Sequence, residues 1–191
     1  MDIKLCKISK QFEGKQVLTD FDATFMEGQI HCLMGASGIG KTTVINLLMG
    51  LIKPDGGAIK GLRGRRIAAV FQEDRLIEHW DAVENVLLVC DKHVKKETVL
   101  QEFAKVGLTE NMDKAVMNLS GGMRRRVAVI RALLAESDLI VMDEPFKGLD
   151  QALKISVVNY IKLRLADKTA IIVTHDKEDV QLLDASLITM F

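Results

Sequence analysis

The chain has 191 residues, of which 48% are hydrophobic and 27% are charged, a length and balance typical of one globular domain with a well-buried core. Lysines plus arginines number 26, and so do aspartates plus glutamates. No overall positive charge is therefore available to recruit nucleic acid, and we expect none as a partner. The three cysteines lie far apart and form no CxxC pair, which argues against a disulfide framework or a zinc site.

The sequence predicts no membrane-spanning helix. Such a helix needs roughly 20 consecutive apolar residues, and even the apolar run from Val127 to Ala135 is interrupted by Arg131. The first residues, Met1 to Cys6, alternate like a strand and lack the charged and apolar regions of a secretory signal. We therefore expect residence in the cytoplasm.

The first third of the chain predicts an antiparallel sheet followed by a buried strand and a helix. Strand-like alternation occurs over residues 3–6 and 17–25. The run 29–34 is short, mostly apolar and stopped by glycine, as is typical of a strand buried on both faces. Residues 42–49 then predict a helix that ends at a glycine, and 58–72 predicts two short strands.

The remainder of the chain alternates helices with strands. From Asp81 to Val106 apolar residues recur three and four apart, which predicts a helical lobe. Further helices are predicted at 123–135 and 152–165, and strands at 139–142, 170–173 and 187–190. This alternation implies an α/β fold with a mainly parallel sheet and right-handed connections.

A phosphate-binding loop is predicted between the buried strand and the first helix. Its residues fit the pattern GxxxxGK[ST]: Gly35, Ala36, Ser37, Gly38, Ile39, Gly40, Lys41 and Thr42. Glycines let backbone N–H groups turn onto phosphate oxygens, and the helix dipole adds positive charge there. Lys41 supplies a full charge to the outer phosphates of ATP, and the Thr42 hydroxyl suits Mg²⁺. The alternative is a glycine-rich turn that matches by chance, and the loop alone does not separate a kinase, a GTPase, a motor and a transporter ATPase.

Polar side chains at the ends of other predicted strands complete this site. Asp143 and Glu144 follow a buried strand, where Asp143 suits the Mg²⁺ shell and Glu144 can polarise water for attack on the γ-phosphate. An acidic surface turn is the alternative. His175 and Gln72 also follow strands, at the sheet edge where ligands bind in open α/β folds. Taken alone, either residue would indicate little.

With Leu119 to Met123 included, the chain resembles the nucleotide-binding domains of ABC proteins over essentially its whole length. In family order it carries the Walker A loop Gly35 to Thr43, the Q-loop Gln72, the signature Leu119 to Met123, the Walker B segment Leu139 to Glu144, the D-loop Gly148 to Asp150 and the switch His175. The resemblance implies one domain, residues 1–191, with a P-loop NTPase sheet, an N-terminal antiparallel layer and a helical subdomain inserted at about residues 74–122.

The resemblance also implies roles for the individual residues. Catalysis is assigned to Glu144, His175 and Gln72, and metal binding to Thr42, Gln72 and Asp143. Nucleotide contacts are assigned to Gly35 through Thr43, to Ser120, Gly121 and Gly122 of a second, head-to-tail copy, and to Asp150. Phe12 lies where the family places a ring against adenine, with a core phenylalanine as the rival interpretation. Ser120 also has a direct physical reading, because serine before two glycines is a helix N-cap with bare amides.

Two departures from the family pattern stand out. Met123 replaces the usual glutamine at the end of the signature, which removes one polar contact near the nucleotide, and the chain continues only briefly after His175. We expect activity to be retained.

The function implied is the ATPase subunit of a transporter, an importer in the first instance, which works at the cytoplasmic face of the membrane with a separate transmembrane permease. Residues 73–86, with Arg75-Leu76 and Trp80, are similar to the taurine, sulfonate and nitrate importer group. The alternatives are an exporter ATPase or a non-transport ABC protein of DNA repair or translation, although tandem cassettes, coiled-coil insertions and basic arms are not visible. The transported substrate is not readable from this chain.

Overall fold

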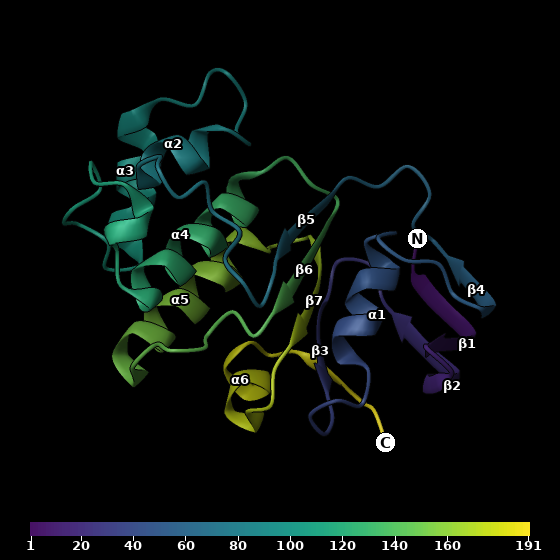
Figure 1. The fold of residues 1–191 in the computed structure, drawn as a ribbon. Helices are drawn as coiled ribbons and strands as arrows, with labels where there is room; N and C mark the ends of the chain where they lie inside the picture. Colours follow the sequence, from purple (N-terminus) through teal and green to yellow (C-terminus); the bar gives the residue numbers. More distant parts are fainter.

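Eight strands form two sheets in the computed structural model, which describes all residues from Met1 to Phe191 (Figure 1). The antiparallel sheet has the order β2-β1-β4, with β1 at Ile3–Phe12, β2 at Lys15–Phe25 and β4 at Gly56–Lys60. The second sheet has the order β5-β6-β7-β3-β8, and every neighbouring pair is parallel. Its strands are β3 (Ile30–Met34), β5 (Ile67–Val70), β6 (Leu139–Asp143), β7 (Thr169–Val173) and β8 (Ser186–Thr189). The predicted α/β class is confirmed.

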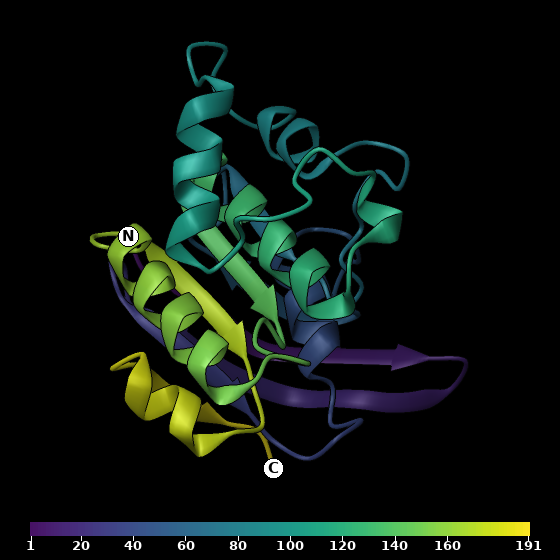
Figure 2. The same ribbon diagram turned by 90° about the vertical axis from the view of Figure 1, so that its left-hand side faces the viewer.

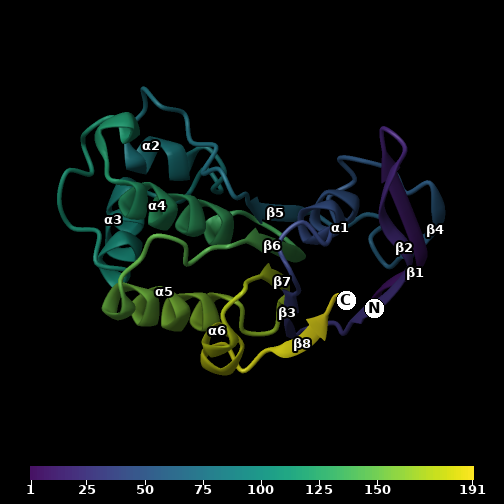
Figure 3. The same cartoon turned by 60° about the horizontal axis from the view of Figure 1, so that its bottom comes forward.

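The chain has six α-helices, and α1 lies on one side of the parallel sheet while the others lie on the opposite side (Figure 3). The helices are α1 (Lys41–Leu48), α2 (Ala82–Leu87), α3 (Lys96–Lys105), α4 (Gly121–Leu134), α5 (Gln151–Arg164) and α6 (Lys177–Leu182), with a 3₁₀ turn at Val116–Asn118. In Figure 2 the teal segment with α2 and α3 rises above the sheet, while the purple β1–β2 hairpin lies below it. None of these helices combines the length and apolar composition that a membrane crossing requires.

The alternation of side chains along the central strands divides the core into two apolar clusters. Leu139 and Val141 of β6 face α1 and the antiparallel sheet, whereas Ile140 and Met142 face the side covered by α2 to α5. Successive residues of a strand point to opposite faces, so one fully buried strand contributes to both clusters. This explains why β6 is apolar at every position before its final aspartate.

Residues 81–106, where the apolar spacing predicts a helical lobe, contain two separate helices, α2 and α3, with a non-helical connection between Leu87 and Lys96. The Asp91 side chain accepts a hydrogen bond from the His93 amide at 2.8 Å, and the Val94 amide donates to the Asp91 carbonyl at 2.9 Å. An aspartate-centred turn of this kind competes with the helical hydrogen bonds, although the apolar spacing continues through it.

Candidate nucleotide site

The loop between β3 and α1 has a shape that requires glycine at two positions. Gly40 has φ 108°, and a Cβ there would lie 2.9 Å from the Leu18 side chain and 3.1 Å from the Val17 side chain. A Cβ on Gly35 would lie 2.9 Å from the Met190 carbonyl. Positive φ is strained for residues with a side chain, and contacts this short force a neighbour to move. The loop is therefore fixed against β2 and the segment after β8.

The same loop presents unpaired amides and a lysine at the N-terminus of α1. The N–H groups of Ser37, Gly38 and Gly40 donate to no backbone carbonyl. The Lys41 ammonium donates to the carbonyls of Gly35 and Ala36, each at 2.8 Å, which folds it back over the loop. Bare amides, a helix N-terminus and an ammonium group together form an anion site suited to phosphate.

A hydroxyl–carboxylate pair lies beside the loop. Thr42 Oγ1 donates to Asp143 Oδ2 at 2.9 Å, which joins the start of α1 to the end of β6. Burial raises the pKa of Asp143, and the adjacent Glu144 carboxylate raises it further, while the bond from Thr42 lowers it. No group of three His, Cys, Asp or Glu side chains gathers as a metal site anywhere in the chain. The hard oxygen donors of Thr42 and Asp143 nevertheless fit Mg²⁺, which commonly binds one or two protein oxygens and takes the rest from phosphate and water.

Glu144 directly follows this pair and points toward His175. The distance from Glu144 Oε1 to His175 Nε2 is 3.2 Å, and Lys147 Nζ lies 3.6 Å from the other carboxylate oxygen. Glu144 has φ 51°, a left-handed conformation that is uncommon for a residue with a side chain. Its amide donates to the Val173 carbonyl at 3.0 Å. The backbone thus turns sharply where β6 ends, and the carboxylate is held at the sheet edge next to β7.

These groups line two adjoining hollows at the carboxyl ends of the parallel strands. The first, of about 390 Å³, is lined among others by Gln72, Lys41, Thr42, Asp143 and Glu144. The second, of about 590 Å³, adds His175 and shares Ser37, Gln72 and Glu144 with the first. The structure thus brings together the loop, the carboxylates, Gln72 and His175 from four separate stretches of sequence. Of the remaining loop residues, Thr43 lines the first hollow, while Ile39 packs against the core beneath it.

The predicted signature residues lie outside these hollows. Ser120 is the N-cap of α4, and its hydroxyl accepts a hydrogen bond from the Met123 amide at 3.3 Å, so the predicted N-cap is confirmed. Gly121 and Gly122 form the first turn of α4. Asp150 is likewise an N-cap, of α5, and accepts from the Leu153 amide at 2.9 Å. One copy of the chain therefore does not place Ser120 against its own Lys41.

Phe12 lies at the end of β1, where 44% of its surface is exposed and the Lys10 ammonium sits 5.4 Å from its ring centre. Its interpretation as a core phenylalanine is therefore wrong. Phe12 does not line the two hollows, but Val17 of β2 does.

Three residues at the site gave no sequence signal that singled them out. Val17 was indistinguishable from other strand residues. Arg125, in the basic run of α4, donates to the carbonyls of Phe71 and Gln72. Lys154 of α5 bonds to Asp176, next to His175, at 2.6 Å. Basic side chains on helices are usually solvated, and only the packing of α4 and α5 against the strand ends turns these two inward.

Comparison with known proteins agrees with this geometry. The family model described as "ABC transporter" matches residues 18–147. The chain is 34% identical to the aliphatic sulfonates import ATP-binding protein SsuB 1 of Rhodococcus jostii, covering 95% of this chain and 76% of that protein. It is 32% identical to the spermidine/putrescine import ATP-binding protein PotA of Fusobacterium nucleatum, covering 93% of this chain but only 52% of that protein. The chain thus spans about half the length of the latter relative.

A solved structure shares the arrangement described above. The dimeric, post-hydrolysis state of the ATP-binding cassette MJ0796, bound to ADP and Pi, superposes with a TM-score of 0.85 at 25% identity, over 98% of this chain and 94% of that one. The chain belongs to the ABC transporter family, in which it corresponds to the ATP-binding cassette. The family predicted from the motifs is confirmed. The similarity to the sulfonate importers does not single out that group, because the polyamine relative matches almost equally well.

Proposed function

We propose that this chain is the ATP-binding and hydrolysing subunit of an ABC importer, which drives a separate membrane permease by ATP-dependent closure of a head-to-tail dimer. The observation that carries the proposal is the convergence of Lys41, the Thr42–Asp143 pair and Glu144 on one hollow. A phosphate-binding lysine, a hydroxyl–carboxylate pair and a base are the parts that phosphoryl transfer to water needs. The relatives SsuB 1 and PotA are import ATP-binding proteins, which supports the transport role.

The chain's own residues divide the reaction between them. The bare amides of the loop and Lys41 hold the phosphates of ATP, while Thr42, Asp143 and Gln72 would hold Mg²⁺, which when bound neutralises phosphate charge. Glu144 accepts a proton from the water that attacks the γ-phosphorus, and ADP leaves with the bridging oxygen. His175, 3.2 Å from Glu144, orients that carboxylate and contacts the γ-phosphate. Phe12 and Val17, on the antiparallel sheet, are assigned to the nucleoside.

A second copy supplies what one chain leaves out. Ser120, Gly121 and Gly122 form a bare helix N-terminus that lies away from Lys41 of the same chain. A two-fold arrangement places this turn of each copy over the γ-phosphate of the other, with Asp150 at the shared boundary. The dimeric cassette bound to ADP and Pi is a precedent in a protein of similar fold.

The decisive experiment separates hydrolysis from closure. The variant Glu144→Gln keeps the size of the side chain and loses the base, so we expect kcat for ATP to fall about 1,000-fold, within the usual range for a general base. ATP, no longer consumed, should then hold the dimer together, because a ligand bound only by the dimer favours it by mass action. Size-exclusion chromatography with light scattering, with and without ATP, measures this.

Two controls make the result specific. Glu136→Gln removes an exposed carboxylate just after α4 and should leave both kcat and oligomeric state unchanged. Glu144→Gln combined with Ser120→Arg should stay monomeric with ATP, because the arginine blocks closure. Wild-type kcat in the Glu144→Gln variant would refute the proposal.

The surface proposed for the permease lies around a hollow of about 640 Å³ between the segment after β5 and the lobe. Three carboxylates, Glu73, Asp74 and Glu78, line it together with Met117, which is 49% exposed. Ile77 and Trp80 lie at its side and are 37% and 39% exposed. Leu76 also lines the hollow but is half-buried against the larger core cluster. Exposed apolar side chains beside a hollow are typical of a protein partner, and docking there puts this chain at the cytoplasmic face of the membrane.

Co-purification with a co-expressed importer permease tests the docking surface. Trp80→Asp and Met117→Asp should each reduce the recovered permease, because an unpaired carboxylate would be buried in the contact. Leu163→Asp, at a 65% exposed position of α5, is the matched control. Equal recovery of the permease with all three variants would exclude this surface.

A further inference from the structure

Side chains of α4 hold the segment that carries Gln72 by hydrogen bonds to the backbone carbonyls of that segment. Arg125 donates from Nη1 to the Phe71 carbonyl at 2.6 Å and from Nη2 to the Gln72 carbonyl at 2.5 Å. Six residues further along α4, Arg131 donates to the carbonyls of Asp74 and Arg75 at 2.9 and 2.8 Å. Two guanidinium groups of one helix therefore bind four carbonyls within five consecutive residues.

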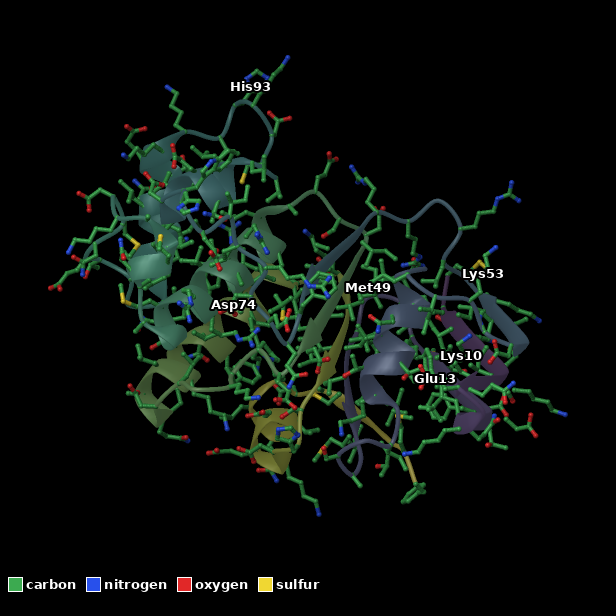
Figure 4. The ribbon with its side chains drawn as sticks, in the orientation of Figure 1. Lys10, Glu13, Met49, Lys53, Asp74 and His93 are labelled. Atoms are coloured by element: carbon green, nitrogen blue, oxygen red, sulfur yellow. The ribbon has the colours of Figure 1, made fainter.

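Arg125 is placed by more than these two bonds. Its residue is only 5% exposed, and Nη1 lies 3.3 Å from the Asp74 carboxylate (Asp74 is labelled beside α4 in Figure 4). A planar guanidinium can bind two neighbouring carbonyls and a carboxylate at once, which a lysine ammonium on a flexible stem does less well. The Arg125 side chain is thus a fixed connection between α4 and the segment after β5, which we call the Arg125 bracket.

Gln72 itself has no other anchor. Its side chain is exposed and makes no hydrogen bond to the rest of the chain, although it lines the hollow with Thr42, Asp143 and Glu144. The direction of an unanchored side chain is set by its backbone, and here the backbone is set by Arg125. Arg125 is also five residues from Ser120 on the same helix. A movement of that N-terminus is therefore passed to Gln72 through one rigid element.

We infer that Arg125 is a positioning residue for the reaction, which holds Gln72 at the metal side of the site and links it to Ser120. This inference rests on the proposed ATP hydrolysis. It predicts that loss of the Arg125 bracket impairs turnover and Mg²⁺ use while the phosphate loop still binds ATP normally. A misplaced polar group near the reacting atoms lowers the rate without weakening contacts elsewhere.

Steady-state kinetics of three variants test this inference. Arg125→Met, which keeps the length of the side chain and removes the donors, should lower kcat about tenfold and raise the Mg²⁺ concentration for half-maximal rate, with KM for ATP changed by less than about twofold. Arg125→Lys should recover part of kcat, because one carbonyl can still be bonded. Arg63→Met removes an exposed arginine elsewhere and should match the wild type.

A double-mutant cycle with Gln72→Ala identifies the pathway of the effect. If Arg125 acts through Gln72, the combination Gln72→Ala with Arg125→Met should be less than about twofold slower than Gln72→Ala alone. Effects that multiply, or a wild-type kcat in Arg125→Met, would overturn the inference. A parallel loss of ATP affinity, without recovery by Arg125→Lys, would show a general structural role and also overturn it.

A readout that needs no turnover keeps this result separate from the proposed function. Arg75 is exposed and has φ 48°, so trypsin cleavage after it reports the order of the segment. We expect severalfold faster cleavage there in Arg125→Met than in Arg63→Met, measured by mass spectrometry. Equal cleavage rates in Arg125→Met and Arg63→Met would show that Arg125 does not hold this segment, and would overturn the inference even in an enzyme that hydrolyses ATP. A wild type that hydrolyses no ATP would instead refute the proposed function.

Discussion

The two faces of the parallel sheet are held in different ways. On the α1 face, apolar side chains pack against the antiparallel sheet, and the phosphate loop is fixed by glycine backbone geometry. On the opposite face the apolar cluster is larger, but buried polar side chains connect its helices to one another or to neighbouring loops: Asn85, Glu102, Arg125 and Arg126. Asn85 bonds both to the Ile77 backbone and to the Asp81 carbonyl, and Arg126 bonds to the carbonyls of Val106 and Gly107.

This difference suits the roles proposed for the two regions. A loop that binds phosphate benefits from rigidity, and packing together with glycine geometry provides it without any bond that a ligand must break. A lobe that receives a partner and moves Gln72 must change position without exposing its core. Directional bonds to backbone carbonyls define one position of the lobe and can be exchanged one at a time.

The largest effect is expected on the rigid side. Lys41→Ala removes the ammonium from a loop whose shape depends on Gly35 and Gly40, so the fold should persist while ATP affinity falls about 100-fold or more. Calorimetric titration with ATP and Mg²⁺ measures this. Lys53→Ala, which removes an exposed lysine after α1 (Figure 4), is the control and should bind like the wild type. ATP affinity within threefold of wild type for Lys41→Ala would exclude the loop as the phosphate site.

A smaller effect, on stability, is expected on the lobe side. Glu102 of α3 accepts from the Tyr160 hydroxyl at 2.7 Å, from Arg164 of α5 and from Lys105. Burial raises the pKa of Glu102, but hydrogen bonds from Arg164, Lys105 and Tyr160 outweigh it and lower the pKa to about 2. Glu102→Gln should therefore lower the free energy of unfolding by about 2 kcal/mol at pH 7. This is less than the pKa shift alone corresponds to, because Arg164 is partly exposed and water weakens its interaction with Glu102. ATP affinity should not change.

The direction of the pKa shift predicts how the stability effect of Glu102→Gln changes with pH. Because the folded pKa of Glu102 is below its ordinary value of 4.5, its contribution is present above pH 4.5 and is lost as the pH falls toward 2. Urea unfolding should thus show a wide gap between wild type and Glu102→Gln at pH 7 and a narrower one at pH 3. Glu97→Gln, at an exposed position of the same helix, is the control. If the difference in unfolding free energy between wild type and Glu102→Gln is the same at pH 7 and pH 3, the charge of the Glu102 carboxylate does not stabilise the contact between α3 and α5.

The contrast between the two faces also explains what the sequence could predict. The phosphate loop, the strands and the N-cap Ser120 are local features, in which neighbouring residues determine the backbone. Arg125 is different. It lies in a run of three arginines, Arg124 to Arg126, and periodicity does not reveal that the side chains of Arg125 and Arg126 bind carbonyls of two distant segments. Such contacts depend on how α4 packs, a property of the whole fold.

The turn within residues 88–95 could not be located from the sequence for a related reason. Periodicity predicts a helical lobe over residues 81–106, but it does not show where one helix of the lobe ends and the next begins. The local hydrogen bonds of Asp91 determine that position. The sequence therefore predicted which elements form the site, and it did not predict which side chains connect them.

The smallest effect on stability is expected at Asp143, where the two faces meet at the end of β6, and here loss of function should come with a slight gain of stability. Because burial raises the folded pKa of Asp143 above its ordinary value of 3.8, the folded protein binds this proton more tightly than the unfolded chain does, and the ionised carboxylate lowers stability at pH 7. Asp143→Asn keeps an oxygen that can accept from Thr42 and removes that charge. We expect a slightly higher Tm than wild type at pH 7, a difference that shrinks as the pH falls toward 4 and the wild-type carboxyl takes up a proton. We also expect loss of Mg²⁺-dependent hydrolysis.

Asp138, just before the same strand, is the matched control of opposite sign, because the Arg66 amide and guanidinium lower its pKa. Asp138→Asn should therefore lower Tm. Differential scanning fluorimetry of both variants from pH 4 to 8 measures the pair. If Asp143→Asn instead has a lower Tm than wild type at pH 7, the ionised carboxylate stabilises this end of the strand, and the prediction that its charge lowers the stability of the fold is wrong.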